Sequence, residues 1–197
     1  MRNRDLRAEL LKALDELLLT EGIGALTLRA VARRAGVSHA APAVHFRNFA
    51  GMLTAYATLG FEELASAVAV ASAAEHADGA AHVRAIGLAY VRFALARPGP
   101  FQVMFRRELL IADDPAFRSA RDATFGPFVG AIARCAREGA FPPEEIAVRS
   151  TAAWSIAHGL ADLWLGGPLR ERVPGVEVEP LAEAVLEVFV GAVLRPR

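Results

Sequence analysis

The feature of this sequence that most constrains its fold is a pair of short helical segments separated by three residues, Ala35-Gly36-Val37. Thr27 is a residue type that caps helix N-termini, and it precedes the first segment, Leu28 to Arg34. Ser38 is a second such residue, and it precedes a segment that reaches about His45. Two short helices joined by a tight, glycine-containing turn are typical of the helix-turn-helix motif. The sequence predicts that motif here.

The rest of the chain also has helical periodicity. A first helix is expected from about Asn3 to Thr20, where leucine recurs at helical spacing and a glycine-rich segment follows. Further helices are expected over residues 50–74, 83–96, 101–110, 116–138, 144–165 and 178–194, with a loop over 166–176. Gly126-Pro127 is expected to kink or divide the helix over 116–138. The pattern predicts an all-α protein of about nine helices, with a three-helix head at residues 1–50 and a helical ligand-binding and dimerisation domain at residues 51–197.

Composition supports an ordered protein and limits its chemistry. Of the 197 residues, 54% are hydrophobic and 22% are charged, so the chain can bury a large core. The net charge is zero, but residues 1–50 carry eight Lys and Arg against five Asp and Glu, and the remainder carries fourteen against seventeen. A basic head on an acidic body suits a protein that presents one end to a polyanion, although chance scatter explains a difference of this size equally well.

Two further observations bear on location and redox chemistry. The single cysteine, Cys135, excludes an intrachain disulfide and a multi-cysteine metal site, and its helical context predicts a packed thiol. The longest uncharged run, Ser150 to Ala161, is shorter than the ~20 residues that a membrane-spanning helix needs. With no targeting segment visible, we expect a soluble, cytoplasmic protein with no membrane partner.

The predicted motif leaves one edge of its second helix free for a partner. Apolar residues of the motif can pack against the first helix, namely Leu28, Val31, Ala32, Val37, Ala41 and Phe46. The outer, N-terminal part of the third helix then presents Ser38, His39, Ala40 and Ala43, a geometry that fits the DNA major groove. Arg29 and Arg33, four residues apart, are natural phosphate partners, and Thr27 and Ser38 stand at helix N-termini that favour phosphate. The alternatives are a solvated face for the arginines and an exposed side chain without a base contact for His39.

A first helix followed by TLRAVARRAGVSHAAPAVHF resembles the head of the TetR family of repressors over residues 8–55. The resemblance implies that His45, before Phe46, contacts the DNA backbone; the alternative is a capping or packing histidine. Two positions depart from the family, because Ala43 stands where it has tyrosine and Phe49 where it has lysine. Each change removes a backbone contact, which weakens binding and lowers its salt dependence, and Arg47 can restore one.

The C-terminal part contains two further segments of this resemblance. Tyr90 to Pro98 and Phe101 to Phe105 resemble one branch of the family, whose Trp-His-Gly signature is matched by Trp154, His158 and Gly159. This part is also rich in aromatic side chains, which favours a small-molecule pocket between residues 90 and 165. The predicted ligand-binding residues are Phe93, Phe101, Met104, Phe105, Phe125, Trp154 and His158. The alternative is a packed core in which His158 is a satisfied hydrogen-bonding residue; a metal site with Asp162 lacks further ligands.

The last two long helices carry apolar stripes that predict a dimer surface. Its predicted residues are Ile156, Leu160, Leu181, Val185 and Phe189. Two helices from each subunit would form a four-helix bundle, and two-fold symmetry would place the two recognition helices ~34–36 Å apart, one turn of DNA. The alternative is that these stripes pack only within one subunit.

The functional hypothesis is a homodimeric repressor. Its expected partners are palindromic double-stranded DNA, a small and largely apolar effector that releases the protein from DNA, and a second copy of the chain. The alternative is a helical binding module of the same fold with weakened DNA recognition, which Ala43 and Phe49 motivate. No enzyme, cofactor or metal is expected, because the sequence contains no phosphate loop, no serine elbow and no cysteine–histidine signature.

Overall fold

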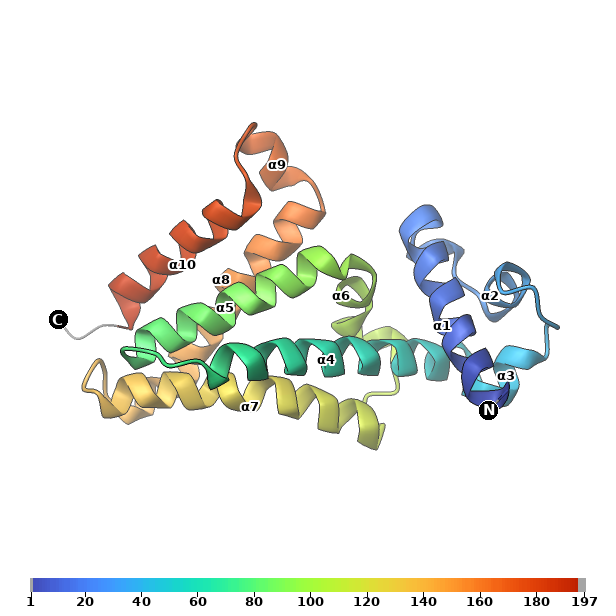
Figure 1. The fold of residues 1–197 in the computed structure, drawn as a ribbon, viewed down its shortest axis with the longest axis horizontal. Helices are drawn as coiled ribbons and strands as arrows, with labels where there is room; N and C mark the ends of the chain where they lie inside the picture. Colours follow the sequence, from blue (N-terminus) through green and yellow to red (C-terminus); the bar gives the residue numbers. More distant parts are fainter. Residues whose placement is uncertain (1, 195–197) are drawn as a thin grey trace. The chain divides into compact units, whose positions relative to one another are not determined.

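The computed structural model describes residues 2–194, and the side chains of residues 6–194. These residues form ten α-helices and three short 3₁₀ helices, with no strand (Figure 1). The predicted all-α class is confirmed, with ten α-helices where about nine were predicted. Within the described range, no helix is both long enough and apolar enough to span a bilayer.

The chain packs as two compact units. Unit 1 comprises the described residues up to Phe61 together with Arg97–Ala120. Unit 2 comprises Glu62–Ala96 together with the described residues from Arg121 onward. These two units do not coincide with the predicted domains, residues 1–50 and 51–197, and the domain division stays a prediction.

Unit 1 contains the predicted motif. Its helices are α1 (Arg2–Glu21), α2 (Leu28–Arg34), α3 (Ala41–Phe46), the first half of α4 (Phe49–Ala73) and α6 (Pro98–Met104), with 3₁₀ helices at Ile23–Ala25 and Arg107–Leu109. The helices α1, α2 and α3 pack against one another, in blue in Figure 1. Their core includes Leu10, Leu14, Val31, Met52 and Leu53, all fully buried, so the leucine periodicity of α1 faces the motif.

Both predicted helix starts in the motif can be compared with the structure. The Thr27 hydroxyl oxygen accepts a hydrogen bond from the Ala30 N–H at 3.0 Å, which confirms Thr27 as the cap of α2. Ser38 does not cap α3, which begins at Ala41 with Ala40 at the N-cap position. The reason is Pro42: in a helix that began after Ser38, its ring would clash with the Ser38 carbonyl four residues back. That carbonyl instead accepts from the Ala41 N–H at 3.0 Å, in a turn.

The joint between α3 and α4 requires glycine. The Asn48 Oδ1 accepts a hydrogen bond from the Gly51 N–H at 2.8 Å and caps α4. A Cβ atom on Gly51 would lie 2.2 Å from the carbonyl oxygen of Phe46, a distance that real Cβ contacts do not reach. Any side chain here would force the two helices apart.

Unit 2 contains the second half of α4 with α5 (Gly79–Ala96), α7 (Pro115–Arg137), α8 (Ile146–Leu165), α9 (Pro168–Arg172), α10 (Val178–Val193) and a 3₁₀ helix at Pro143–Glu145; α7 begins in unit 1. The helices α5, α8 and α10 pack against one another (Figure 1). Cys135 on α7 is 1% exposed, so the predicted packed thiol is confirmed.

Two expectations about these helices were wrong, and a third was wrong in part. The helix α7 is not divided at Gly126-Pro127, since one proline removes only one helical hydrogen bond; the alternative, a kink there, stays a prediction. The helix expected over residues 101–110 is instead α6, which begins at Pro98 because proline suits the first helical position, followed by the 3₁₀ helix. The loop expected over 166–176 contains α9, whose five residues are too few to show a periodicity.

Candidate nucleic-acid interface and apolar cavity

The second helix of the motif has one buried face and one exposed face. Pro42 and Phe46 of α3 are buried, and Val31 and Ala32 of α2 are fully buried beside them in unit 1. On the other side, the predicted base-reading residues Ser38, His39, Ala40 and Ala43 are all exposed. Val44, which the sequence analysis did not single out, is 79% exposed on the same side. We call these five residues the outer edge of α3.

The arginines of α2 differ in what they contact. Arg29 and Arg33 are exposed, and neither has an ion-pair partner among the side chains that the structure describes. Arg34 is held by α1, because its Nε donates to Glu16 Oε2 at 3.0 Å. Two of the three cations are therefore available to a phosphate.

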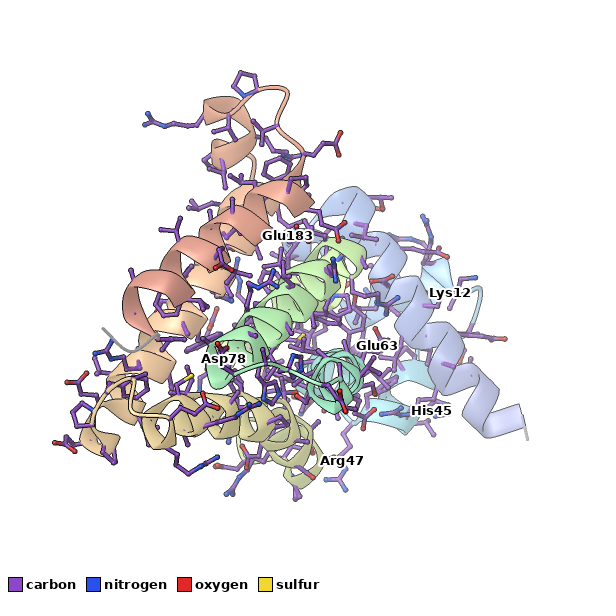
Figure 2. The ribbon with its side chains drawn as sticks, turned by 60° about the vertical axis from the view of Figure 1, so that its left-hand side comes forward. Lys12, His45, Arg47, Glu63, Asp78 and Glu183 are labelled. Atoms are coloured by element: carbon purple, nitrogen blue, oxygen red, sulfur yellow. The ribbon has the colours of Figure 1, made fainter. Side chains whose placement is uncertain are left out.

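Further basic residues lie where α3 ends. Figure 2 labels His45 and Arg47; His45 is half-buried and Arg47 is exposed. Arg47 has a φ of 65°, and no other non-glycine residue of the described chain has a positive φ. The guanidinium of Arg7 lies 5.2 Å from the centre of the Phe46 ring, a cation–π contact. Arg7, His45 and Arg47 line a hollow of about 340 Å³, together with Thr54, Thr58 and Asp114. Sequence reasoning missed Arg7, because only the tertiary packing brings it beside α3.

Unit 2 contains a small apolar cavity. Its volume is about 30 Å³, and its lining residues come from α4, α5, α7, α8 and α10: Val68, Val83, Ile86, Gly87, Tyr90, Thr124, Phe125, Phe128, Ala153, Trp154, Ala157, Leu186 and Phe189. Tyr90 and Thr124 supply the hydroxyl groups of this lining, and Trp154 an indole N–H; no lining side chain is charged. A cavity of this size holds about one water molecule, so a ligand requires it to widen.

A part-buried hydrogen bond joins Tyr90 of the cavity lining to His158 on α8. The Tyr90 hydroxyl lies 2.7 Å from Nδ1 of His158. Burial raises the pKa of Tyr90 well above its usual range, so the phenol stays protonated. Burial also lowers the pKa of His158, against an opposing effect of Asp162.

Four of the predicted ligand-binding residues lie in unit 2, and the other three lie in unit 1. Phe125 and Trp154 line the cavity and pack edge to face, with ring centres 5.5 Å apart at 83°. His158 contacts the cavity through Tyr90, and Phe93 is buried without lining it. Phe101, Met104 and Phe105 belong to unit 1 and lie outside the lining; the Phe105 ring centre is 5.6 Å from that of Phe61. Sequence reasoning missed Tyr90, Thr124 and the small residues, because small side chains that leave space give no signal in a periodicity.

The predicted dimer residues lie on α8 and α10. Leu160 and Phe189 are buried within unit 2, at 7% and 6% exposure. Ile156, Leu181 and Val185 are partly exposed, and the same helices expose Leu163 at 49% and Val188 at 74%. The dimer surface stays a prediction.

A helix-turn-helix with an exposed outer edge and exposed arginines, in an all-helical chain, defines a DNA-binding protein of the helix-turn-helix class. Residues 10–56 match the family model of bacterial regulatory proteins of the tetR family, and residues 83–189 match that of the tetracyclin repressor-like C-terminal domain. The chain belongs to the TetR family of transcriptional regulators, with an N-terminal DNA-binding domain. The resemblance found in the sequence is thereby confirmed; the Trp-His-Gly branch is not confirmed and stays a prediction.

Solved structures share the fold along nearly the whole chain. A protein of unknown function from Rhodococcus sp. RHA1 is 29% identical, with a TM-score of 0.79 and 96% of each chain covered. The TetR family regulator PfmR from Thermus thermophilus is 21% identical, with a TM-score of 0.71 and coverage of 92% of this chain and 97% of its own. A tetR family regulatory protein from Rhodococcus RHA1 is 20% identical, with a TM-score of 0.74 and coverage of 97% and 98%. Among curated proteins, none matches this chain.

Proposed function

We propose that this protein is a ligand-responsive repressor, a homodimer that binds a palindromic operator and is released by a small, largely apolar effector. The observation that supports this best is the outer edge of α3, which is exposed while Arg29 and Arg33 beside it have no ion-pair partner among the described residues. TetR regulators bind operator DNA and are dimers. Such a protein acts in the cytoplasm, where the DNA is.

On the DNA side, each exposed group has a distinct role in the proposal. The outer edge enters the major groove, and Arg29, Arg33 and Arg47 contact phosphates. Thr27 keeps its hydroxyl proton for a phosphate, because its oxygen already accepts from Ala30. His45 is half-buried against Phe46, so both of its roles stay open: a backbone contact or a packing residue.

On the effector side, the lining of the unit 2 cavity sets the chemistry. It offers aromatic and aliphatic surface with two hydroxyl groups, those of Tyr90 and Thr124, and no charge, which suits a neutral, apolar molecule with one polar group. Since the cavity holds about one water, the effector binds a widened arrangement and selects it from the ensemble.

The coupling between effector and DNA needs a physical link. The helix α4 is continuous and contributes to both units: Met52 is in the core of unit 1 and Val68 lines the cavity of unit 2. If widening the cavity displaces α4, the separation of the two heads in the dimer changes. The effector must bind the released arrangement more tightly than the DNA-bound one, since otherwise nothing shifts.

The test of DNA binding is fluorescence anisotropy with DNA upstream of the protein's own gene, titrated at several salt concentrations. We expect binding to a palindromic segment that weakens as salt rises. Absence of binding at low salt to every palindrome in that region would contradict the proposal.

The test of the effector site uses neutral aromatic probes such as 2-naphthol, with fluorescence of Trp154 and DNA release as readouts. The matched variant is Ala157→Leu, which fills the cavity from α8. We expect a probe that releases wild-type protein to leave the variant on DNA. Equal release of both proteins would place the effector elsewhere.

A second candidate function is a helical binding module of this fold with weakened DNA recognition. Ala43 is exposed and Phe49 is half-buried, so neither supplies the phosphate contact that the family resemblance leads one to expect. Affinity for random DNA discriminates the two functions, because a working head binds it in a salt-dependent manner.

A further inference from the structure

The outer edge of α3 is unusually apolar for a surface that meets DNA. Ala40 lies three residues before Ala43 and four before Val44, so these three residues lie on one broad side at the start of α3, and Arg47 follows where the helix has ended. All four are exposed, and Val44 is more exposed than any other large apolar side chain that the structure describes. Pro42 and Phe46 face the core instead, and the described side chains of unit 1 leave this apolar stripe exposed.

The residues on and before α3 also limit which bases can be read by hydrogen bonds. Residues 38–46 contain no Arg, Lys, Asn or Gln, the side chains that make bidentate contacts with guanine or adenine. Their polar side chains are Ser38, His39 and His45. The apolar contact that a base edge offers in the major groove is the C5-methyl group of thymine.

Charge supports DNA as the occupant of this stripe. Arg29 and Arg33 are exposed on α2, the helix that packs against α3, and Arg47 is exposed directly after α3. A protein partner for an apolar stripe would not need three exposed cations around it, whereas a duplex needs both the cations and the groove contact.

We propose that Val44, with Ala40 and Ala43 beside it, reads the operator through thymine methyl groups, so that thymine at the facing base pairs determines specificity. This inference rests on the proposed function. Ala43 contributes through its small size, which lets the helix approach the bases closely enough for the Val44 methyl groups to make contact.

The experiment replaces thymine by uracil, which removes the methyl group and leaves base pairing unchanged. The tightest-binding duplexes are first selected from random DNA with the full-length protein. Single dT→dU changes, made symmetrically in both half-sites, are then measured by anisotropy. We expect one or two positions per half-site at which each lost methyl weakens binding about fourfold, or about fifteenfold for the symmetric pair.

Two variants connect the effect to Val44. Val44→Ala should bind the dT and dU duplexes equally at the sensitive position, because the contacting methyl groups are gone. Val70→Ala is the matched control: Val70 is 76% exposed on α4, far along the chain from the motif, and this variant should keep the wild-type preference for dT. Circular dichroism verifies that both variants are folded.

The outcomes separate the two proposals. If duplexes are selected but every dT→dU change binds within twofold of the parent, thymine methyl reading is wrong while the repressor proposal stands. The same holds if Val44→Ala keeps the full preference for dT. If no duplex binds in a salt-dependent manner, the proposed function itself fails.

Discussion

The two candidate sites of this protein are built in opposite ways. In unit 1 the outer edge of α3 is exposed, and its position depends on turns and caps, such as the Thr27 cap and the contact of Gly51 with Phe46. In unit 2 the cavity is enclosed by five helices and depends on which side chains leave space. Substitutions on the outer edge should therefore change binding without changing stability, whereas substitutions around the cavity should change both.

The joint between α3 and α4 is the part of unit 1 where a substitution should change the free energy of unfolding most. Gly51→Ala should destabilise the protein by about 3 kcal/mol, because its Cβ would meet the Phe46 carbonyl oxygen at 2.2 Å. Urea denaturation measures the change. The control is Gly130→Ala on α7, where nothing lies within 4 Å of an added Cβ, so the variant should gain up to about 1 kcal/mol in stability. Equal stability of both variants would contradict the close packing of this joint.

Substitution of an exposed arginine should change DNA binding without changing the stability of the protein. Arg33→Gln removes one phosphate contact per subunit, so the slope of log affinity against log salt should fall by about 2 for the dimer, and affinity at 0.1 M salt by roughly 50-fold. The free energy of unfolding should change by less than about 0.5 kcal/mol. Arg34→Gln is the matched control, since Arg34 is paired with Glu16, and it should leave the slope unchanged. If Arg34→Gln lowered the salt slope and the DNA affinity more than Arg33→Gln, then Arg34 and not Arg33 would be the phosphate contact.

The Tyr90–His158 pair tests whether substitutions around the unit 2 cavity change the stability of the protein. Tyr90→Phe should cost about 1–2 kcal/mol in stability, because it leaves Nδ1 of His158 without its hydrogen-bond partner. A double-mutant cycle with His158→Ala isolates the pair from other losses. Additive effects in that cycle would show that the hydrogen bond contributes nothing.

The smallest expected effect is the contribution of His158 to the pH dependence of stability. Because the pKa of His158 is lowered on folding, the folded protein binds fewer protons than the unfolded one just below pH 6.5. Stability is therefore full above pH 6.5 and falls as pH drops toward the lowered pKa. His158→Asn keeps an acceptor for Tyr90 and does not titrate, so its stability should fall less between pH 7.5 and pH 5. Some dependence should remain, since burial, with His76 and Arg134, also lowers the pKa of His82.

The same contrast explains what could be predicted from the sequence. The bounds of α2 follow from Thr27 and the Gly36 turn, because caps and turns are local signals. The start of α3 was misplaced at Ser38, because the proline four residues later has the stronger effect. In unit 2 the helix periodicity predicted the long helices, but the cavity depends on tertiary packing. Tyr90 and Ala157 were therefore not predicted as lining residues, and Phe101 was assigned to a pocket although it lies in unit 1.

In the proposed homodimer, the outer edges of α3 from the two subunits read one face of a duplex together. A hydroxyl-radical footprint on a selected duplex is the sharpest test of this arrangement. We expect two protected segments related by two-fold symmetry, with centres one helical turn of DNA apart, ~34–36 Å. Val44→Ala should weaken both segments equally. A single protected segment, or protection that survives unchanged when Arg29 and Arg33 are both replaced by Gln, would contradict it.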